Sequence, residues 1–407
     1  MNRKQFAILV VLLIVLGGAG LLLLKKQSQE SSAGEQGAGQ KILGEKFPVN
    51  DVAQITVKSG TNTLTLVKKD DLWRVRERDD YPANFQQISE VLIKLADMKA
   101  AQVEQIGPSQ LGRLELTPPG SGNNSGTLVD LKDKDGKPLK SLTLGKKHVQ
   151  KSKSATPSPY GDEGFPDGRY VMVSGNSQDA LLISDSLNNL EPKASEWLKK
   201  DFFHVERPKA IAVTFPAATN SWKIVRDTET GEWKFADAKP DEKLDTSKVS
   251  GVSNPFSSPS FNDIVSLSAK PEDNGLDKPT LVTIDTFDDF TYTVKVGKKT
   301  SDDYPIMMAV EAHFPAERIP SKDEKPEDKD KADKAWKERQ KQLETKLKDA
   351  QAFAKWTYLV PSYSVDPILK ERKDLLEEKK KDEAKPGDKA DATTEKAATA
   401  AAESKPN

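Results

Sequence analysis

Residues 53–75 read AQITVKSGTNTLTLVKKDDLWRV, and residues 211–235 read IAVTFPAATNSWKIVRDTETGEWKF. In both stretches apolar residues alternate with polar ones, as in half-buried strands joined by polar turns. The first two predicted strands recur at an offset of 158 residues. The third recurs at an offset of 160, because the turn at 227–231 is two residues longer than its counterpart. The two stretches therefore predict an internal repeat.

Further landmarks follow in the same order in both copies. The first copy has Val129, Leu131, Leu142, Leu144, the strand 170–173 and a closing Trp197, and the second has Val282, Ile284, Val294, Val296, the strand 305–310 and a closing Trp356. The changes in length are confined to polar turns. We expect two tandem copies of one β-rich domain.

Each copy is predicted to carry one main helix. Residues 88–95 of the first copy place Ile88, Val91, Leu92 and Leu95 on one helical face, and Asn84 precedes them as an N-cap. The second copy has only Val249 and Val252 at matching places, since Gly251 and Pro255 shorten any helix there. The predicted fold class is α+β, with mainly antiparallel strands.

A run of nineteen apolar or glycine residues at 6–24 precedes the repeat. As a helix it would be about 28 Å long, enough to cross a bilayer. A cleaved secretory signal is the alternative, but the run is longer than usual and ends in leucines rather than in small residues. Basic residues flank both ends, so the charges do not orient the anchor. We expect a single-pass protein of the bacterial inner membrane with its bulk on the periplasmic side.

These patterns divide the chain into segments. They are a short flank at 1–5, the transmembrane anchor at 6–24, a flexible linker at 25–46, the first repeat domain at 47–202, the second at 203–365 and a disordered charged tail at 366–407. The second domain contains a Lys-, Glu- and Asp-rich insertion at 321–347. This insertion is either a partner-binding arm or a solvated surface helix, and its charge pattern favours the surface helix.

The composition excludes several classes of protein. The 407 residues include no cysteine, so thiol catalysis and cysteine-bound zinc are excluded. A formal net charge of -1 gives no basic surface for nucleic acid. No catalytic motif is present, and His148, His204 and His313 stand too far apart to indicate a metal site. We therefore predict no enzyme activity, no cofactor, no metal and no nucleic-acid partner.

Two features remain as candidates for binding. The sequence Gly-Lys-Lys occurs at 145–147 and again at 297–299, so Lys146, Lys147, Lys298 and Lys299 are candidate contact residues for an anionic group. Lysines that follow a strand more often protect a sheet edge and keep a surface soluble. The repeated tryptophans could stack on sugar rings, but their placement at strand starts and domain ends fits core positions better.

The landmarks resemble a membrane-anchored family, domain of unknown function 4340. The resemblance is carried by ITV at 55–57, LTL at 64–66, DLWRV at 71–75, PAN at 82–84, LG at 111–112, PP at 118–119 and LTLGKK at 142–147. It covers most of residues 47–205 and, more loosely, the second copy to about 365. Members have one N-terminal anchor and a β-rich body, and many are encoded beside ABC transporter permeases and gliding-type auxiliary proteins. The family has no established activity or catalytic residues.

Three functions stay open at this point. The favoured one is a membrane-tethered, non-enzymatic accessory protein that contacts an ABC transporter permease or auxiliary subunit. The alternative is a module that binds envelope polysaccharide through aromatic and lysine side chains. A carboxylate-based enzyme is the third, although the sequence localises no such pair.

Overall fold

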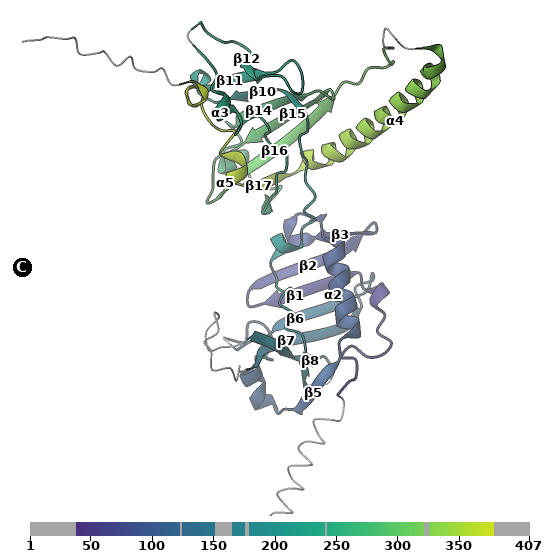
Figure 1. Cartoon of the computed structure of the whole chain (residues 1–407). Coiled ribbons are helices and arrows are strands. Elements are labelled where there is room, and N and C mark those ends of the chain that lie inside the picture. The colour runs from purple at the N-terminus through teal and green to yellow at the C-terminus, as the bar shows by residue number, and fades with distance from the viewer. Residues whose placement is uncertain are drawn as a thin grey trace, which may run out of the picture.

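The computed structural model describes residues 38–122, 124–150, 165–175, 179–240, 242–320 and 325–377. Figure 1 shows two β-rich lobes, one for each copy of the repeat, joined end to end. Each lobe contains one antiparallel sheet, and apolar residues of both lobes belong to one connected core.

The first domain contains a nine-stranded sheet with the order β4-β3-β2-β1-β6-β7-β8-β9-β5. Its elements are β1 (Gln54–Ser59), β2 (Asn62–Lys69), β3 (Leu72–Val75), β4 (Tyr81–Pro82), α2 (Phe85–Asp97), β5 (Ala100–Gln105), β6 (Thr127–Lys132), β7 (Pro138–Gln150), β8 (Phe165–Val173) and β9 (Asp179–Ile183). Helix α2 lies across one face of this sheet (Figure 1).

The second domain contains an eight-stranded sheet with the order β12-β11-β10-β14-β15-β16-β17-β13. Its elements are β10 (Pro208–Thr214), β11 (Trp222–Val225), β12 (Lys234–Phe235), α3 (Thr246–Val249), β13 (Asp263–Val265), β14 (Thr280–Thr286), β15 (Phe290–Val296), β16 (Asp303–Ala312), α4 (Pro326–Gln351), β17 (Thr357–Pro361) and α5 (Ser362–Val365). Apart from β4, its strands have the same spatial order as those of the first sheet. The predicted repeat is therefore confirmed, and so are the two antiparallel sheets with few helices.

The strand pairing corrects the offset predicted for the first strand. Ile55 of β1 lies opposite Leu131 of β6, while Ile211 of β10 lies opposite Ile284 of β14. Because Leu131 and Ile284 are equivalent, Ile55 corresponds to Ile211, and the offset is 156 rather than 158. Side chains alternate with a period of two along a strand, so a slip of two residues keeps every apolar residue on the same face. Alternation alone could not detect this error.

The main helix predicted for the first copy is confirmed, whereas in the second copy the helix at the matching place is a single turn and α4 is the longest helix. The Asn84 side chain accepts a hydrogen bond from the Gln87 amide at the start of α2, and the four predicted face residues are buried. In the second copy, α3 has four residues and begins after Asp245, whose carboxylate accepts from the Ser247 and Lys248 amides. Because α3 ends at Val249, Val252 lies in the loop after the helix, where its side chain is fully buried.

The equivalence predicted between Trp197 and Trp356 is wrong. Trp197 follows β9, whereas Trp356 precedes β17, the strand that corresponds to β9. The Trp197 carbonyl accepts from the Asn84 amide, and the Leu375 carbonyl accepts from the Asp245 amide in the same way. Trp197 therefore corresponds to Leu375. Residues up to 377 belong to the second domain, and the boundary predicted at 366 is too early because Ile368 and Leu375 are buried.

The first domain also begins earlier than the predicted boundary at residue 47. The Gly39 amide donates to the Ala100 carbonyl, and the Ala100 amide donates to the Gln40 carbonyl, so this segment runs along the outer edge of β5. Ile42 and Leu43 are buried in the core. Residues 39–43 were expected in the flexible linker because the composition around them is polar, and two apolar residues were too weak a signal to show that the segment packs.

The two sheets are arranged head to tail. The first sheet ends at β4, and the second sheet ends at β13 on the side that faces it. Tyr81 of β4 contacts Phe261, which lies two residues before the start of β13, with the two ring centroids 6.0 Å apart. The edge of one copy thus contacts the opposite edge of the next copy, and the segment 199–207 connects them.

Candidate functional site at the domain junction

An ion pair joins the two domains beside β4 and β13. The Arg78 guanidinium donates two hydrogen bonds of 2.7 Å to the carboxylate of Asp263. The neighbouring Asp79 carboxylate accepts from the Leu267 amide at 2.9 Å. Arg78 and Asp263 are both largely shielded from solvent, with side-chain exposures of 29% and 22%. Since charge-assisted, bidentate pairs fix geometry better than single contacts, this pair sets the orientation of one domain against the other.

An aromatic cluster fills the interior of the junction. The Tyr81 ring stands edge-on to the Trp356 ring, with centroids 5.0 Å apart. From the connecting segment, the Phe202 ring lies 4.6 Å from Tyr358 and 5.1 Å from Phe261. Such edge-to-face and tilted contacts are favourable for aromatic rings, so both domains and their connection share one apolar interface.

A cavity of about 660 Å³ opens beside this cluster. Its walls come from β4, the connecting segment, β15, the C-terminal half of α4 and the start of β17. The aromatic residues that line it are Tyr81, Phe202, Phe203, Tyr292, Phe353, Trp356 and Tyr358. The polar and charged lining residues are Lys199, Asp201, His204, Gln342, Thr345, Lys346 and Asp349. We call this cavity the junction pocket. Its size, apolar lining and place between domains are typical of small-molecule binding sites.

Three phenol groups in the pocket wall stay neutral at physiological pH. Burial raises the pKa of Tyr81 to about 12 and that of Tyr292 to about 12. Burial, with a smaller contribution from Tyr81, also raises the pKa of Tyr358. The Tyr81 and Tyr358 hydroxyls are close enough to affect each other's pKa, yet the Tyr358 oxygen is buried without a hydrogen bond of normal geometry within the described residues. A buried hydroxyl without a partner is unusual in a folded protein.

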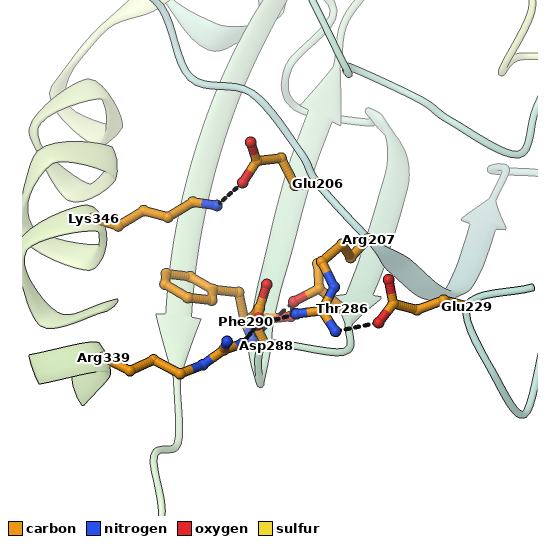
Figure 2. A network of polar contacts seen from close by, with 8 residues as sticks. All are labelled: Glu206, Arg207, Glu229, Thr286, Asp288, Phe290, Arg339 and Lys346. Atoms are coloured by element: carbon orange, nitrogen blue, oxygen red, sulfur yellow. Dashed lines mark hydrogen bonds and ion pairs between the residues drawn. The ribbon is translucent and has the colours of Figure 1, made fainter. Parts of the chain in front are cut away.

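Ion pairs fix the wall that α4 contributes. Figure 2 shows Lys346 of α4 reaching Glu206 and Arg339 of α4 reaching Asp288, which sits in the turn between β14 and β15. These two contacts measure 2.5 Å each. Asp288 also accepts from Arg207, and its side chain is only 9% exposed. Of the predicted insertion at 321–347, residues 326–347 belong to α4, which continues to Gln351 and has its C-terminal half attached to the second domain, while residues 321–324 lie outside the described residues.

The predicted lysine candidates lie away from the junction pocket. Lys146 and Lys147 belong to β7, and Lys298 and Lys299 follow β15; all four are exposed. Lys146 and Lys147 lie beyond the last pair of β7 with β6, Thr127 with Leu144, so the interpretation of these lysines as edge protection and solubility stays a prediction. Lys299 pairs with Asp366 at 3.4 Å. The two lysine pairs belong to separate domains, and their role as contact residues stays a prediction.

The glycines of the two Gly-Lys-Lys sequences have a packing role. A Cβ atom on Gly145 would collide with the Leu114 carbonyl oxygen and lie 2.7 Å from Cδ2 of Leu116. A Cβ atom on Gly297 would collide with the Asn274 carbonyl oxygen. In each copy a short 3₁₀ helix, Pro108–Leu114 or Pro271–Asn274, packs against the glycine. The recurrence of glycine therefore follows from the repeated packing.

The tryptophans occupy core positions for the most part. Trp73, Trp197 and Trp356 are at most 6% exposed, which confirms the core interpretation for them. Trp233 is half-buried and stacks under the Arg226 guanidinium, 4.8 Å from the ring centre. These side chains do not form an exposed sugar-stacking platform. His148 pairs with Asp167 at 2.6 Å and His204 with Glu206 at 3.3 Å, so these two histidines contact different carboxylates.

The predicted anchor at 6–24 and the flank at 1–5 lie outside the described residues. Within the described part of the chain, no helix is both long enough and apolar enough to cross a membrane.

The chain is therefore a tandem-repeat β protein with a pocket between its two copies. Residues 73–155 and 160–279 match the family model for a domain of unknown function, DUF4340, and the chain belongs to this family. The second matched region runs from the end of the first domain into the second, so the matches do not follow the boundary between the domains. No curated protein and no solved structure gives a significant match.

Sequence reasoning missed most of the junction pocket. Trp356 was singled out as the end of a repeat, and Phe202-Phe203 lies at the predicted domain boundary, but the other aromatic residues are scattered over nearly 300 positions. The Phe202-Phe203 doublet could have indicated an interface between the domains. Two adjacent phenylalanines in a connecting segment are buried only if both neighbouring domains cover them.

Proposed function

We propose that this chain is a membrane-tethered, non-enzymatic accessory protein that acts through protein contacts. In this proposal residues 6–24 anchor it in the bacterial inner membrane, and the two-domain body lies on the periplasmic side. The partner is an ABC transporter permease or an auxiliary subunit of the gliding type. Membership of the DUF4340 family and the apolar run at 6–24 support the proposal.

The observation that carries it is an arm present in only one copy of the repeat. Strands β8 and β9 are separated by residues 174–178, whereas the equivalent strands β16 and β17 are separated by residues 313–356. We define the arm as residues 313–320 together with α4. In Figure 1 the N-terminal end of α4 points away from the second sheet. A structural element added to one copy, and projecting from it, is well placed to contact another protein.

The arm is held firmly enough to present a defined surface. Beyond the two ion pairs to the sheet, Arg318 donates to Asp333 at 2.6 Å and so ties the N-terminal half of α4 to the strand-like segment before it. Trp336 lies beside Phe314 and Pro315, around a hollow of about 430 Å³. A preorganised charged helix loses less conformational entropy on binding than a mobile one.

The exposed face of the arm carries charges of both signs. Lys331, Lys334 and Lys337 are exposed along it, with Glu338 beside them. Charged side chains of this kind contribute to partner selection and association rate through electrostatic complementarity. We therefore place the partner contact on the N-terminal half of α4.

Affinity purification of the full chain from mild detergent, followed by mass spectrometry, tests this proposal. We expect a permease or auxiliary subunit at near-stoichiometric yield. The variant K331E/K334E/K337E should lose it, and a matched reversal of exposed lysines in the first domain, K134E/K137E, should retain it. Absence of any stoichiometric protein partner would overturn the proposal, and equal recovery with both variants would overturn the assignment to the arm.

A reporter enzyme fused after Asn407 tests the orientation. Activity of a periplasm-specific reporter is the expected result. Activity only of a cytoplasm-specific reporter would contradict the proposed localisation.

A further inference from the structure

Protein contacts through the N-terminal half of α4 do not account for the junction pocket. The arm's exposed lysines lie on the N-terminal half of α4, whereas the pocket is lined by the C-terminal half, from Gln342 to Ala350. The cavity of about 660 Å³ is lined by aromatic rings, of which Phe202 and Phe353 are only partly buried and so keep some apolar surface in contact with water. Such a surface is unfavourable unless something covers it.

The lining shows which kind of molecule would cover it. Its floor consists of the Tyr81, Phe202, Phe353 and Trp356 rings, which offer apolar contact and ring edges. These rings contact one another closely, with Phe202 and Phe353 centroids 5.8 Å apart, so the floor is already formed without a ligand. A preformed apolar wall favours an apolar molecule, because little order has to be gained on binding.

The charges at the rim do not select an ionic ligand. Lys199 pairs with Asp201 at 3.0 Å, and Lys346 pairs with Glu206 at 2.5 Å. Both lysines that line the opening are thus already paired with a carboxylate. A charged ligand would have to displace one of these pairs, whereas an uncharged molecule would leave both intact.

The pocket wall also contains a buried hydroxyl whose only polar neighbour among the described residues is the Tyr81 hydroxyl. Tyr358 is only 1% exposed, and its hydroxyl makes no hydrogen bond of normal geometry among the described residues. The Tyr81 hydroxyl is its polar neighbour. A ligand hydroxyl or carbonyl that reached this pair, after a small rotation of either ring, would give the buried oxygen the hydrogen bond that it lacks.

We propose that the junction pocket binds an uncharged, mainly apolar small molecule that carries one hydroxyl or carbonyl group. Its apolar body lies against the aromatic floor between the domains, and its polar group meets the hydroxyls of Tyr81 and Tyr358. The C-terminal half of α4, held by Lys346 and Arg339, forms the wall that covers it.

Photolabelling of the full chain in lipid nanodiscs tests this proposal. The probe is 3-trifluoromethyl-3-phenyldiazirine, which is uncharged and apolar, and mass spectrometry locates its adducts. We expect saturable adducts on peptides that contain Phe202, Phe353 and Trp356. Excess 1-dodecanol should remove them, whereas dodecanoate and dodecylammonium at the same concentration should not. Preferential competition by either ion, or labelling confined to residues outside the pocket, would overturn the proposal.

Two pocket variants and one control complete the experiment. Ala350→Trp fills the cavity from α4, and Thr345→Trp narrows its mouth from an exposed position. Each should lower pocket labelling by about fivefold or more, since a tryptophan side chain occupies much of a cavity of this size. Ile93→Trp, on the exposed face of α2, should leave labelling unchanged. Retained labelling in a Thr345→Trp protein with native hydrogen exchange would contradict the assignment even if Ala350→Trp does not fold.

The Tyr358→Phe variant tests the polar contact. It should weaken competition by 1-dodecanol and leave competition by dodecane unchanged. Equal competition by the two compounds in the wild-type chain would show that the pocket does not recognise the hydroxyl group, and that part of the proposal would fail.

Discussion

Gly145→Ala is expected to destabilise the first domain because the added methyl group has no space. Its Cβ atom would overlap the carbonyl oxygen of Leu114 and lie 2.7 Å from the Leu116 side chain. The oxygen belongs to the backbone of a 3₁₀ helix, so no side-chain rotation can move it away. Overpacking costs about 1–3 kcal/mol, and the reduced freedom of the unfolded alanine chain offsets about 0.4–1 kcal/mol. We expect a net loss of about 1.3 kcal/mol in the free energy of unfolding.

The equivalent glycine of the second copy allows a second test, and Gly112 in the 3₁₀ helix Pro108–Leu114 provides a control. Gly297→Ala should destabilise the second domain in the same way, through the carbonyl oxygen of Asn274. Gly112→Ala should be neutral or slightly stabilising, because a Cβ atom there meets nothing within 4 Å and the backbone has no positive φ.

Hydrogen exchange of the full chain, followed by mass spectrometry, separates the two domains. A loss of about 1.3 kcal/mol corresponds to roughly ninefold faster exchange in the most protected amides. Gly145→Ala should accelerate peptides from β6 and β7, and Gly297→Ala those from β14 and β15. Equal protection in Gly145→Ala and Gly112→Ala would refute the packing argument. The glycine would then need another explanation, such as close approach of a bound anion to the backbone.

Three further predictions follow from contacts described above. Arg78→Ala and Asp263→Ala should each destabilise the domain junction, and denaturation of the single and double variants should give a coupling energy of about 1–2 kcal/mol; additive effects would show that the pair contributes nothing. Asn84→Ala removes the N-cap of α2 and should lower the free energy of unfolding by about 1 kcal/mol, measured by urea denaturation; an unchanged midpoint would contradict this role. The hydrogen bond from Lys346 lowers the pKa of Glu206 from 4.5, so this contact stabilises the fold above about pH 4.5 and is lost as the pH falls through the lowered value. The melting temperature of Lys346→Met should therefore fall below that of the wild type at pH 7 but not at pH 3, and an equal difference at both would contradict the assignment.

Periodic patterns in the sequence predicted the strands well because each strand has one buried face. Alternation located the strand around Ile55 and its counterpart around Ile211, and the face of each was correct. The register between the copies was wrong by two residues, since a period of two is unchanged by such a slip. Pairing with a third strand, which the sequence does not display, was needed to align them.

The domain boundaries were harder to predict than the strands. Residues 39–43 and 366–377 pack on their domains through a few apolar side chains, among them Ile42, Leu43 and Leu375. Each segment lies beside a long polar stretch, so its average composition indicates a linker or a tail. What holds these segments is backbone pairing with distant residues, such as the amide of Asp245 with the carbonyl of Leu375.

The junction pocket could not be derived from local patterns for a similar reason. Tyr81 and Tyr358 come from different copies and are buried at positions that a strand pattern assigns simply to the core. Only the relative placement of the domains turns them into the walls of a cavity. That placement depends on the Arg78 pair, whose partner Asp263 is 185 positions away and lies in a three-residue strand.

The head-to-tail contact between the two sheets has a consequence for self-association. When like units join through unlike edges, each free end can in principle accept another unit, and the assembly can grow without limit. Here the free ends are mismatched. Glu242 stands in the second domain where the first has Tyr81, and Gln102 stands in the first domain where the second has Asp263. Residues 39–42 also cover the start of β5, through backbone pairing with residues 98–100. Because the free ends do not match, the duplicated fold disfavours the open-ended growth that matched edges would allow.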